Sequence, residues 1–77
     1  MARVNWTSQA LADLEAIGDF ISRDAPSFAQ VFVNRAFQAV ERLENFPYLG
    51  RLVPEISQDN IREIIFGSYR IVYQVNN

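Results

Sequence analysis

Residues 61–77, IREIIFGSYRIVYQVNN, contain two short apolar runs separated by Gly67-Ser68, and this stretch constrains the fold more than any other. The first run is rich in Ile and Phe, and the second is rich in Ile, Val and Tyr. Runs of β-branched and aromatic residues on either side of a Gly-containing dipeptide are typical of a β-hairpin. Asn76-Asn77 is another turn signal, and no third apolar run follows it. The sequence therefore predicts one hairpin at this end of the chain.

The length of the hairpin loop decides which side chains share a face of the sheet. A two-residue loop, which we favour, predicts these cross-strand pairs: Phe66 with Tyr69, Ile64 with Ile71, and Arg62 with Tyr73. This face is the more apolar one, so we expect it to meet the helices. The residues left on the open face are Glu63, Ile65, Arg70, Val72 and Gln74. A three-residue loop would instead move Arg62 to the side of Arg70, because a one-residue slip reverses the faces of a strand.

Two helices are predicted before the hairpin. Residues 9–24 carry apolar side chains at spacings of three and four, the stripe of an amphipathic helix, and Thr7 or Ser8 supplies its N-cap. A second helix begins near Pro26 and ends at Asn45. It has two apolar stripes: Phe28, Phe32, Ala36, Ala39 and Leu43 form the first, and Val33, Phe37 and Val40 form the second. A helix this apolar must be sandwiched in the fold or offer one face to a partner, so Val33 and Phe37 are candidate partner-binding residues.

The predicted elements define one small domain over residues 1–77. Residues 2–6 alternate and suit a short first strand, so the expected order is strand, helix, helix, strand, strand. Two helices joined by a tight turn would pack as a helical hairpin on one face of a small antiparallel sheet, which makes a two-layer α+β domain. The residues expected to be largely buried are Trp6, Leu14, Ile17, Phe32, Val40, Ile64, Phe66 and Ile71.

Composition excludes several kinds of chemistry. The chain has no Cys and no His, so thiolate nucleophiles, Cys-ligated metals and histidine bases are absent, and we expect neither a metal nor a cofactor. The net charge is −2, which argues against a dedicated, sequence-specific nucleic-acid binder. The sequence contains no membrane-length apolar run and no secretory pattern at its start, so we expect a cytoplasmic location without membrane association.

The element order and two motifs resemble the RelE/ParE superfamily of bacterial toxins. The motifs are Pro47-x-x-Gly50-Arg51 after the second helix and the Tyr-Arg-Ile-Val-Tyr strand, residues 69–73. Within the superfamily the chain looks closer to the ParE branch of toxin-antitoxin, or plasmid stabilisation, systems. This resemblance implies a non-enzymatic toxin that binds and inhibits DNA gyrase and is neutralised by a cognate antitoxin. It makes Arg51, Arg62 and Arg70 candidate partner-binding residues.

The RelE branch, which cleaves messenger RNA on the ribosome, is the alternative that the resemblance implies. Arg62, Arg70 and Tyr73 would then be catalytic, but Ile64 stands where that family has a second lysine. Simpler structural roles remain open as well. Arg70 can pair with Glu63 across the strands. Tyr73 can lie at the edge of the core with its hydroxyl exposed to solvent. Arg51 can donate hydrogen bonds to carbonyl groups near the end of the second helix.

Compared with the family, we expect the chain to lack a final strand after Asn76-Asn77. The strand left unpaired would then invite a second copy or an antitoxin segment to add to the sheet. A truncated family member that only binds antitoxin is a third functional hypothesis. We expect this 77-residue form to be associated or partner-bound in solution and weakly toxic or non-toxic when expressed alone.

Overall fold

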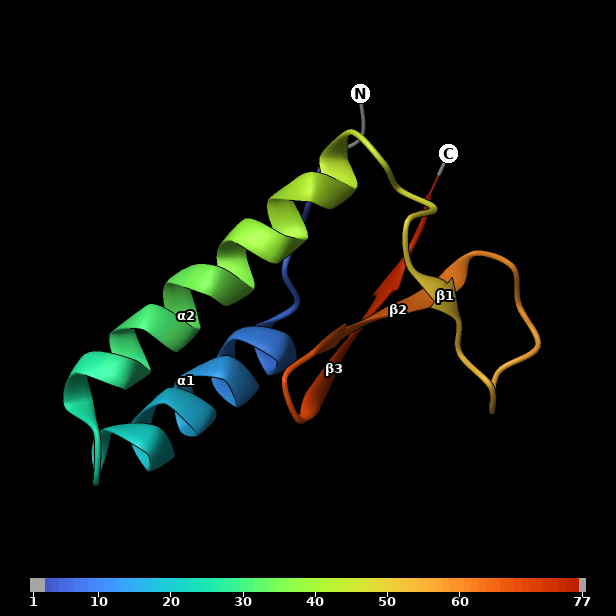
Figure 1. The fold of residues 1–77 in the computed structure, drawn as a ribbon. Helices are drawn as coiled ribbons and strands as arrows, with labels where there is room; N and C mark the ends of the chain where they lie inside the picture. Colours follow the sequence, from blue (N-terminus) through green and yellow to red (C-terminus); the bar gives the residue numbers. More distant parts are fainter. Residues whose placement is uncertain (1–2, 77) are drawn as a thin grey trace.

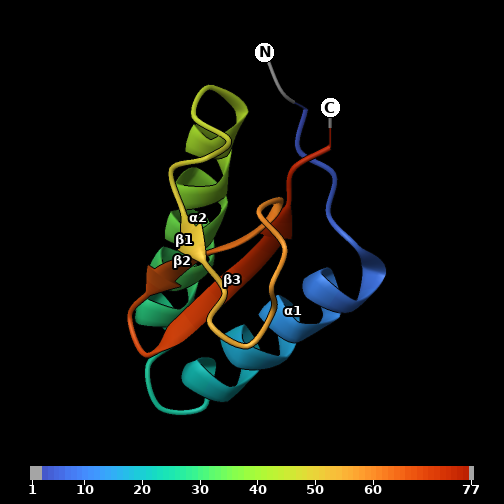
Figure 2. The same ribbon diagram turned by 90° about the vertical axis from the view of Figure 1, so that its right-hand side faces the viewer.

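A computed structural model describes residues 3–76 as two helices packed beside a small sheet (Figure 1). The elements are α1 (Ser8–Ser22), α2 (Pro26–Glu41), a 3-10 turn η1 (Arg42–Glu44), β1 (Arg51–Leu52), β2 (Ile61–Phe66) and β3 (Tyr69–Gln74). The sheet is antiparallel with the strand order β1-β2-β3. Both views show α1 and α2 as a helical hairpin on one side of the strands (Figure 2). The α+β class and the two-layer arrangement are therefore confirmed.

The strand expected before the first helix is not observed in the described residues. Residues 3–7 form no strand, residue 2 lies outside the described part of the chain, and the observed order is α-α-β-β-β. Residues 3–7 are held by side-chain packing and not by the backbone hydrogen bonds of a strand. The ring centroid of Trp6 lies 5.0 Å from that of Phe37 on α2. The third strand of the sheet is β1, two residues that pair with Glu63 and Arg62.

The hairpin has the predicted two-residue loop. Phe66 pairs with Tyr69, Ile64 with Ile71, and Arg62 with Tyr73. Gly67 has φ +62°, the sign that the first central position of a type II′ hairpin turn requires. The ring of Phe66 lies 5.0 Å from that of Phe32 on α2, so the apolar face of the hairpin does meet the helices.

Within the described residues, the buried hydrophobic core consists of five aliphatic residues. Ala29, Ala36 and Val40 of α2, Leu43 of η1 and Val53 are buried. Of the residues expected to be largely buried, Val40 is fully buried and the rest are half-buried, because two helices cover only one side of so small a sheet. Thr7 caps α1 by accepting a hydrogen bond from the amide of Ala10, and neither helix is long and apolar enough to span a bilayer within the described residues.

Candidate functional site

A buried carboxylate joins β1 to the hairpin. Glu63 is 1% exposed and accepts hydrogen bonds from Arg51 Nε at 2.7 Å and from Arg70 Nη1 at 2.9 Å. The expectation that Glu63 lies on an open face is wrong: the residue is buried, and it stands opposite Arg51 of β1 in the sheet. The expected pair between Arg70 and Glu63 is present, and both carboxylate oxygens are occupied.

The Arg70 guanidinium is held by a second carboxylate. Its Nη1 and Nη2 atoms donate to Glu55 Oε1 at 3.0 Å and Oε2 at 2.7 Å, the bidentate geometry that makes Arg–carboxylate pairs strong. These hydrogen bonds lower the pKa of Glu55 to about 2 and raise the pKa of Arg70 further above its ordinary range. Arg70 therefore shares its charge between Glu55 and Glu63.

The motif Pro47-x-x-Gly50-Arg51 docks on the hydroxyl of Tyr73. Tyr73 Oη donates to the carbonyl oxygen of Pro47 at 2.7 Å and accepts from the amide of Gly50 at 2.9 Å. A Cβ at position 50 would lie 2.6 Å from the carbonyl oxygen of Glu63 and 2.7 Å from this hydroxyl. Only glycine fits this close approach, which explains the motif in structural terms.

Arg62 is also engaged with backbone. Its Nε donates to the carbonyl oxygen of Asp59 and its Nη1 to that of Gly50, each at 3.0 Å. Its guanidinium carbon lies 4.9 Å from the ring centroid of Tyr48, a cation–π distance. Arg62, which the sequence offered as a catalytic or partner-binding residue, therefore links the segment around Gly50 to the segment around Asp59.

The two apolar candidates on α2 both contact other parts of the fold. A Cβ on Gly18 of α1 would lie 3.2 Å from Val33 Cγ2, so Val33 packs against α1, and Phe37 lies against Trp6. Phe37 nevertheless keeps 36% of its surface exposed. The structure thus brings Arg51, Arg70 and Glu63 together, and it places Val33 and Phe37 apart from them.

A model of the ParE toxin of type II toxin-antitoxin systems, parDE, matches residues 4–77. The chain belongs to the ParE toxin family. It is therefore the toxin component of a type II toxin-antitoxin system, a class of toxin that pairs with a cognate antitoxin.

Two curated proteins are similar to this ParE-family chain. "Toxin RelE2" of Caulobacter vibrioides is 46% identical over 76 residues, which cover 97% of this chain and 82% of that protein. "Putative toxin Y4kP" of Sinorhizobium fredii is 41% identical over 49 residues, which cover 64% of this chain and 51% of that protein. No solved structure gives a significant match. The matching family is named ParE and one matching protein is named RelE2, so names from both branches of the superfamily occur among the matches.

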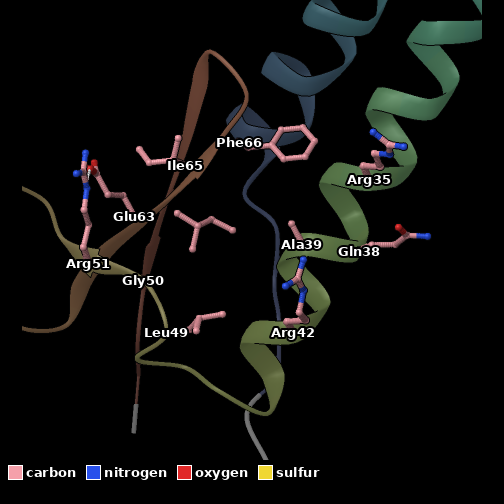
Figure 3. Close-up of a pocket in the computed structure, with 11 residues that line it drawn as sticks. Arg35, Gln38, Ala39, Arg42, Leu49, Gly50, Arg51, Glu63, Ile65 and Phe66 are labelled. Atoms are coloured by element: carbon pink, nitrogen blue, oxygen red, sulfur yellow. Dashed lines mark hydrogen bonds and ion pairs between the residues drawn. The ribbon is translucent and has the colours of Figure 1, made fainter.

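The ParE-family chain also contains a cleft that sequence reasoning missed. This arginine cleft, about 630 Å³, lies between α2 and the β1 edge of the sheet (Figure 3). Arg35, Gln38 and Arg42 line one wall, and Leu49, Arg51 and Ile65 line the other. The available signal was the spacing of residues 35, 38 and 42, three and then four apart, which places them on one face of a helix.

Proposed function

We propose that this ParE-family toxin acts by binding DNA gyrase, without catalysing a reaction, and that its antitoxin blocks that binding. One observation carries the proposal: Arg62, Arg70 and Tyr73, the side chains that an RNA-cleaving mechanism would use, are all bonded to the protein itself.

Cleavage of RNA needs a group that takes a proton from the 2′-hydroxyl and cations that stabilise charge on the phosphate. The hydroxyl of Tyr73 already donates to one carbonyl and accepts from one amide. Arg70 is neutralised by Glu55 and Glu63. A phosphate would have to displace two carboxylates from Arg70, so this arrangement favours a structural role for these residues.

Among the candidate partner-binding arginines, Arg51 is the one best placed for a contact. Its Nε is bonded to Glu63, yet its side chain is 64% exposed, and within residues 3–76 its two Nη atoms make no hydrogen bond. We propose that these Nη atoms contact gyrase or the antitoxin.

A ribosome-dependent endoribonuclease is the second candidate, and the observation in its favour is the 46% identity to a protein named Toxin RelE2. Two assays on the purified chain separate the candidates: supercoiling of relaxed plasmid by gyrase, and translation-dependent cleavage of messenger RNA. We expect inhibition of supercoiling and intact messenger RNA. Cleavage without gyrase inhibition would overturn the proposal, and activity in neither assay would support a member that only binds antitoxin.

A further inference from the structure

We propose that Glu63 is a positioning residue of this toxin: it fixes the Arg51 side chain so that the two Nη atoms of Arg51 stay free to bind a carboxylate on the surface of the target protein. That the target is DNA gyrase rests on the proposed function. That Glu63 positions Arg51 rests on the geometry of these two residues, which lie opposite each other on β2 and β1.

The carboxylate of Glu63 is enclosed and held from two sides (Figure 3). Its Oε2 atom accepts from Arg51 Nε at 2.7 Å, and its Oε1 atom accepts from Arg70 Nη1 at 2.9 Å. Arg70 is itself fixed, because it also donates to both carboxylate oxygens of Glu55. Hydrogen bonds between ionised groups are the strong ones in proteins. The Glu63 carboxylate therefore holds the Arg51 Nε–H group in one place.

The backbone at the base of Arg51 is fixed as well. The amide of the preceding Gly50 donates to Tyr73 Oη at 2.9 Å, and the Gly50 carbonyl oxygen accepts from Arg62 Nη1 at 3.0 Å. The Arg51 side chain is nevertheless 64% exposed. Both ends of its aliphatic stem are thus held, while the guanidinium end lies at the surface.

An arginine held in this way binds a partner at a lower entropic cost. An ordinary surface arginine loses rotamer freedom when it is immobilised in an interface, and this loss corresponds to roughly two- to tenfold in affinity. Within residues 3–76 the two Nη atoms of Arg51 make no hydrogen bond. Their spacing matches the two oxygens of a carboxylate. Arg51 is therefore preorganised for an acidic group of the target.

The surroundings of Arg51 favour a carboxylate of a protein over a phosphate of a nucleic acid. Leu49 and Leu52, on either side of it in the sequence, are 57% and 48% exposed. Exposed apolar side chains rimmed by polar groups are typical of protein-binding surfaces. The whole chain carries −2, which opposes binding to a polyanion.

The test is a double-mutant cycle on the inhibition of gyrase supercoiling, with concentrations corrected for the folded fraction of each variant. Glu63→Gln keeps the shape of the side chain and removes the charge that holds Arg51. We expect it to raise the half-inhibitory concentration roughly fivefold in the wild type and less than about 1.5-fold in an Arg51→Gln background. Equal fold-changes in the two backgrounds would overturn the proposal.

Glu55→Gln is the matched control, because it makes the same charge change and also loosens Arg70, but Glu55 makes no bond to Arg51. It should shift the half-inhibitory concentration less than about twofold. Inhibition as weak as that of Glu63→Gln would show that the whole ion-pair network matters and not the hold on Arg51.

Arg51→Lys keeps the charge at an exposed position but has neither an Nε–H group for Glu63 nor a pair of Nη atoms. We expect it to weaken inhibition roughly fivefold as well. Since the position is exposed, this variant tests the proposal even where Glu63→Gln does not fold. Full inhibition by Arg51→Lys would overturn the proposal, because any exposed positive charge would then suffice.

A spectroscopic signature of Arg51 requires no gyrase. An arginine Nε–H group bonded to a buried carboxylate is shielded from exchange with water and gives a resolved signal in ¹H–¹⁵N spectra near neutral pH, which Arg51→Gln assigns. We expect the signal in the wild type and in Glu55→Gln, and its loss in folded Glu63→Gln. Its absence from the wild type, or its persistence in Glu63→Gln, would overturn the positioning role. A wild type that does not inhibit gyrase would instead refute the proposed function, and the Nε–H signal would still decide whether Glu63 fixes Arg51.

Discussion

The hydroxyl of Tyr73 lies 2.9 Å from the amide nitrogen of Gly50, across 23 residues of sequence, and the same hydroxyl donates to Pro47. Tyr73→Phe removes one donor and one acceptor and leaves a part-buried amide and carbonyl without a partner. We expect a loss of about 1–3 kcal/mol in the free energy of unfolding, measured by urea denaturation.

Tyr69→Phe is the matched control, because within residues 3–76 the Tyr69 hydroxyl makes no hydrogen bond and the residue is 40% exposed. It should change stability by no more than about 0.5 kcal/mol. Equal losses in the two variants would show that the Tyr73 hydroxyl does not hold the Pro47–Gly50 segment.

Phe32 contributes the main aromatic contact between α2 and the hairpin, with ring centroids 5.0 Å from Phe66 and 5.7 Å from Tyr69. Because Phe32 is half-buried, Phe32→Ala should cost ~3 kcal/mol, the lower end for truncation of a core aromatic, which is a large share of the stability of so small a domain. Phe28→Ala, on the same helix and 59% exposed, is the control for lost helix-surface contacts. An unchanged melting temperature for Phe32→Ala would remove Phe32 from the core.

How far the sequence predicts this fold can be seen by comparing the hairpin with β1. The register of β2 and β3 follows from the two-residue loop at Gly67-Ser68, which places the more apolar set of side chains on one face. A two-residue strand such as Arg51–Leu52 is too short to show an alternating hydrophobic pattern, so the sequence does not predict it. Glu63 pairs with Arg51 of that strand across 12 residues of sequence, so the burial of Glu63 could not be predicted from the hairpin alone.

The candidate site shows the same limit. The resemblance singled out Arg51, Arg62, Arg70 and Tyr73, and the structure does place them around one small region. Which of their polar atoms are already bonded depends on tertiary contacts: Glu55 and Glu63 hold Arg51 and Arg70, and backbone groups hold Arg62 and Tyr73. Sequence identifies such a cluster by motif, but the ion pairs decide its chemistry.

The Glu55–Arg70 pair makes stability depend on pH in the acid range. The pKa of Glu55 falls from its ordinary 4.5 to about 2 in the folded protein, chiefly because Arg70 hydrogen-bonds the charged form. A depressed folded pKa contributes stability that is fully present above about 4.5 and is lost as pH falls toward about 2. We expect Glu55→Gln to flatten the pH dependence of the melting temperature in this window.

Glu15→Gln, which removes an exposed carboxylate that bonds to no described side chain, should leave that pH dependence in place. An identical pH profile for Glu55→Gln and the wild type would mean that the Glu55–Arg70 pair does not form in solution.

The outer edge of β3 is unpaired within the described residues, although a groove of about 730 Å³ lies between it and residues 3–7. Val72 sits opposite Glu63 in the ladder position whose amide points away from β2. Unpaired edges of this kind pair with another strand, so we expect the protein to self-associate as its concentration rises, measured by sedimentation velocity. Val72→Pro removes an outward amide and no hydrogen bond between β2 and β3, so it should abolish association while the domain stays folded. Ile71→Pro, one residue away, removes an amide bonded to β2 and should unfold the hairpin. A monomer at every concentration, or a Val72→Pro variant that associates like the wild type, would show that this edge is not the contact.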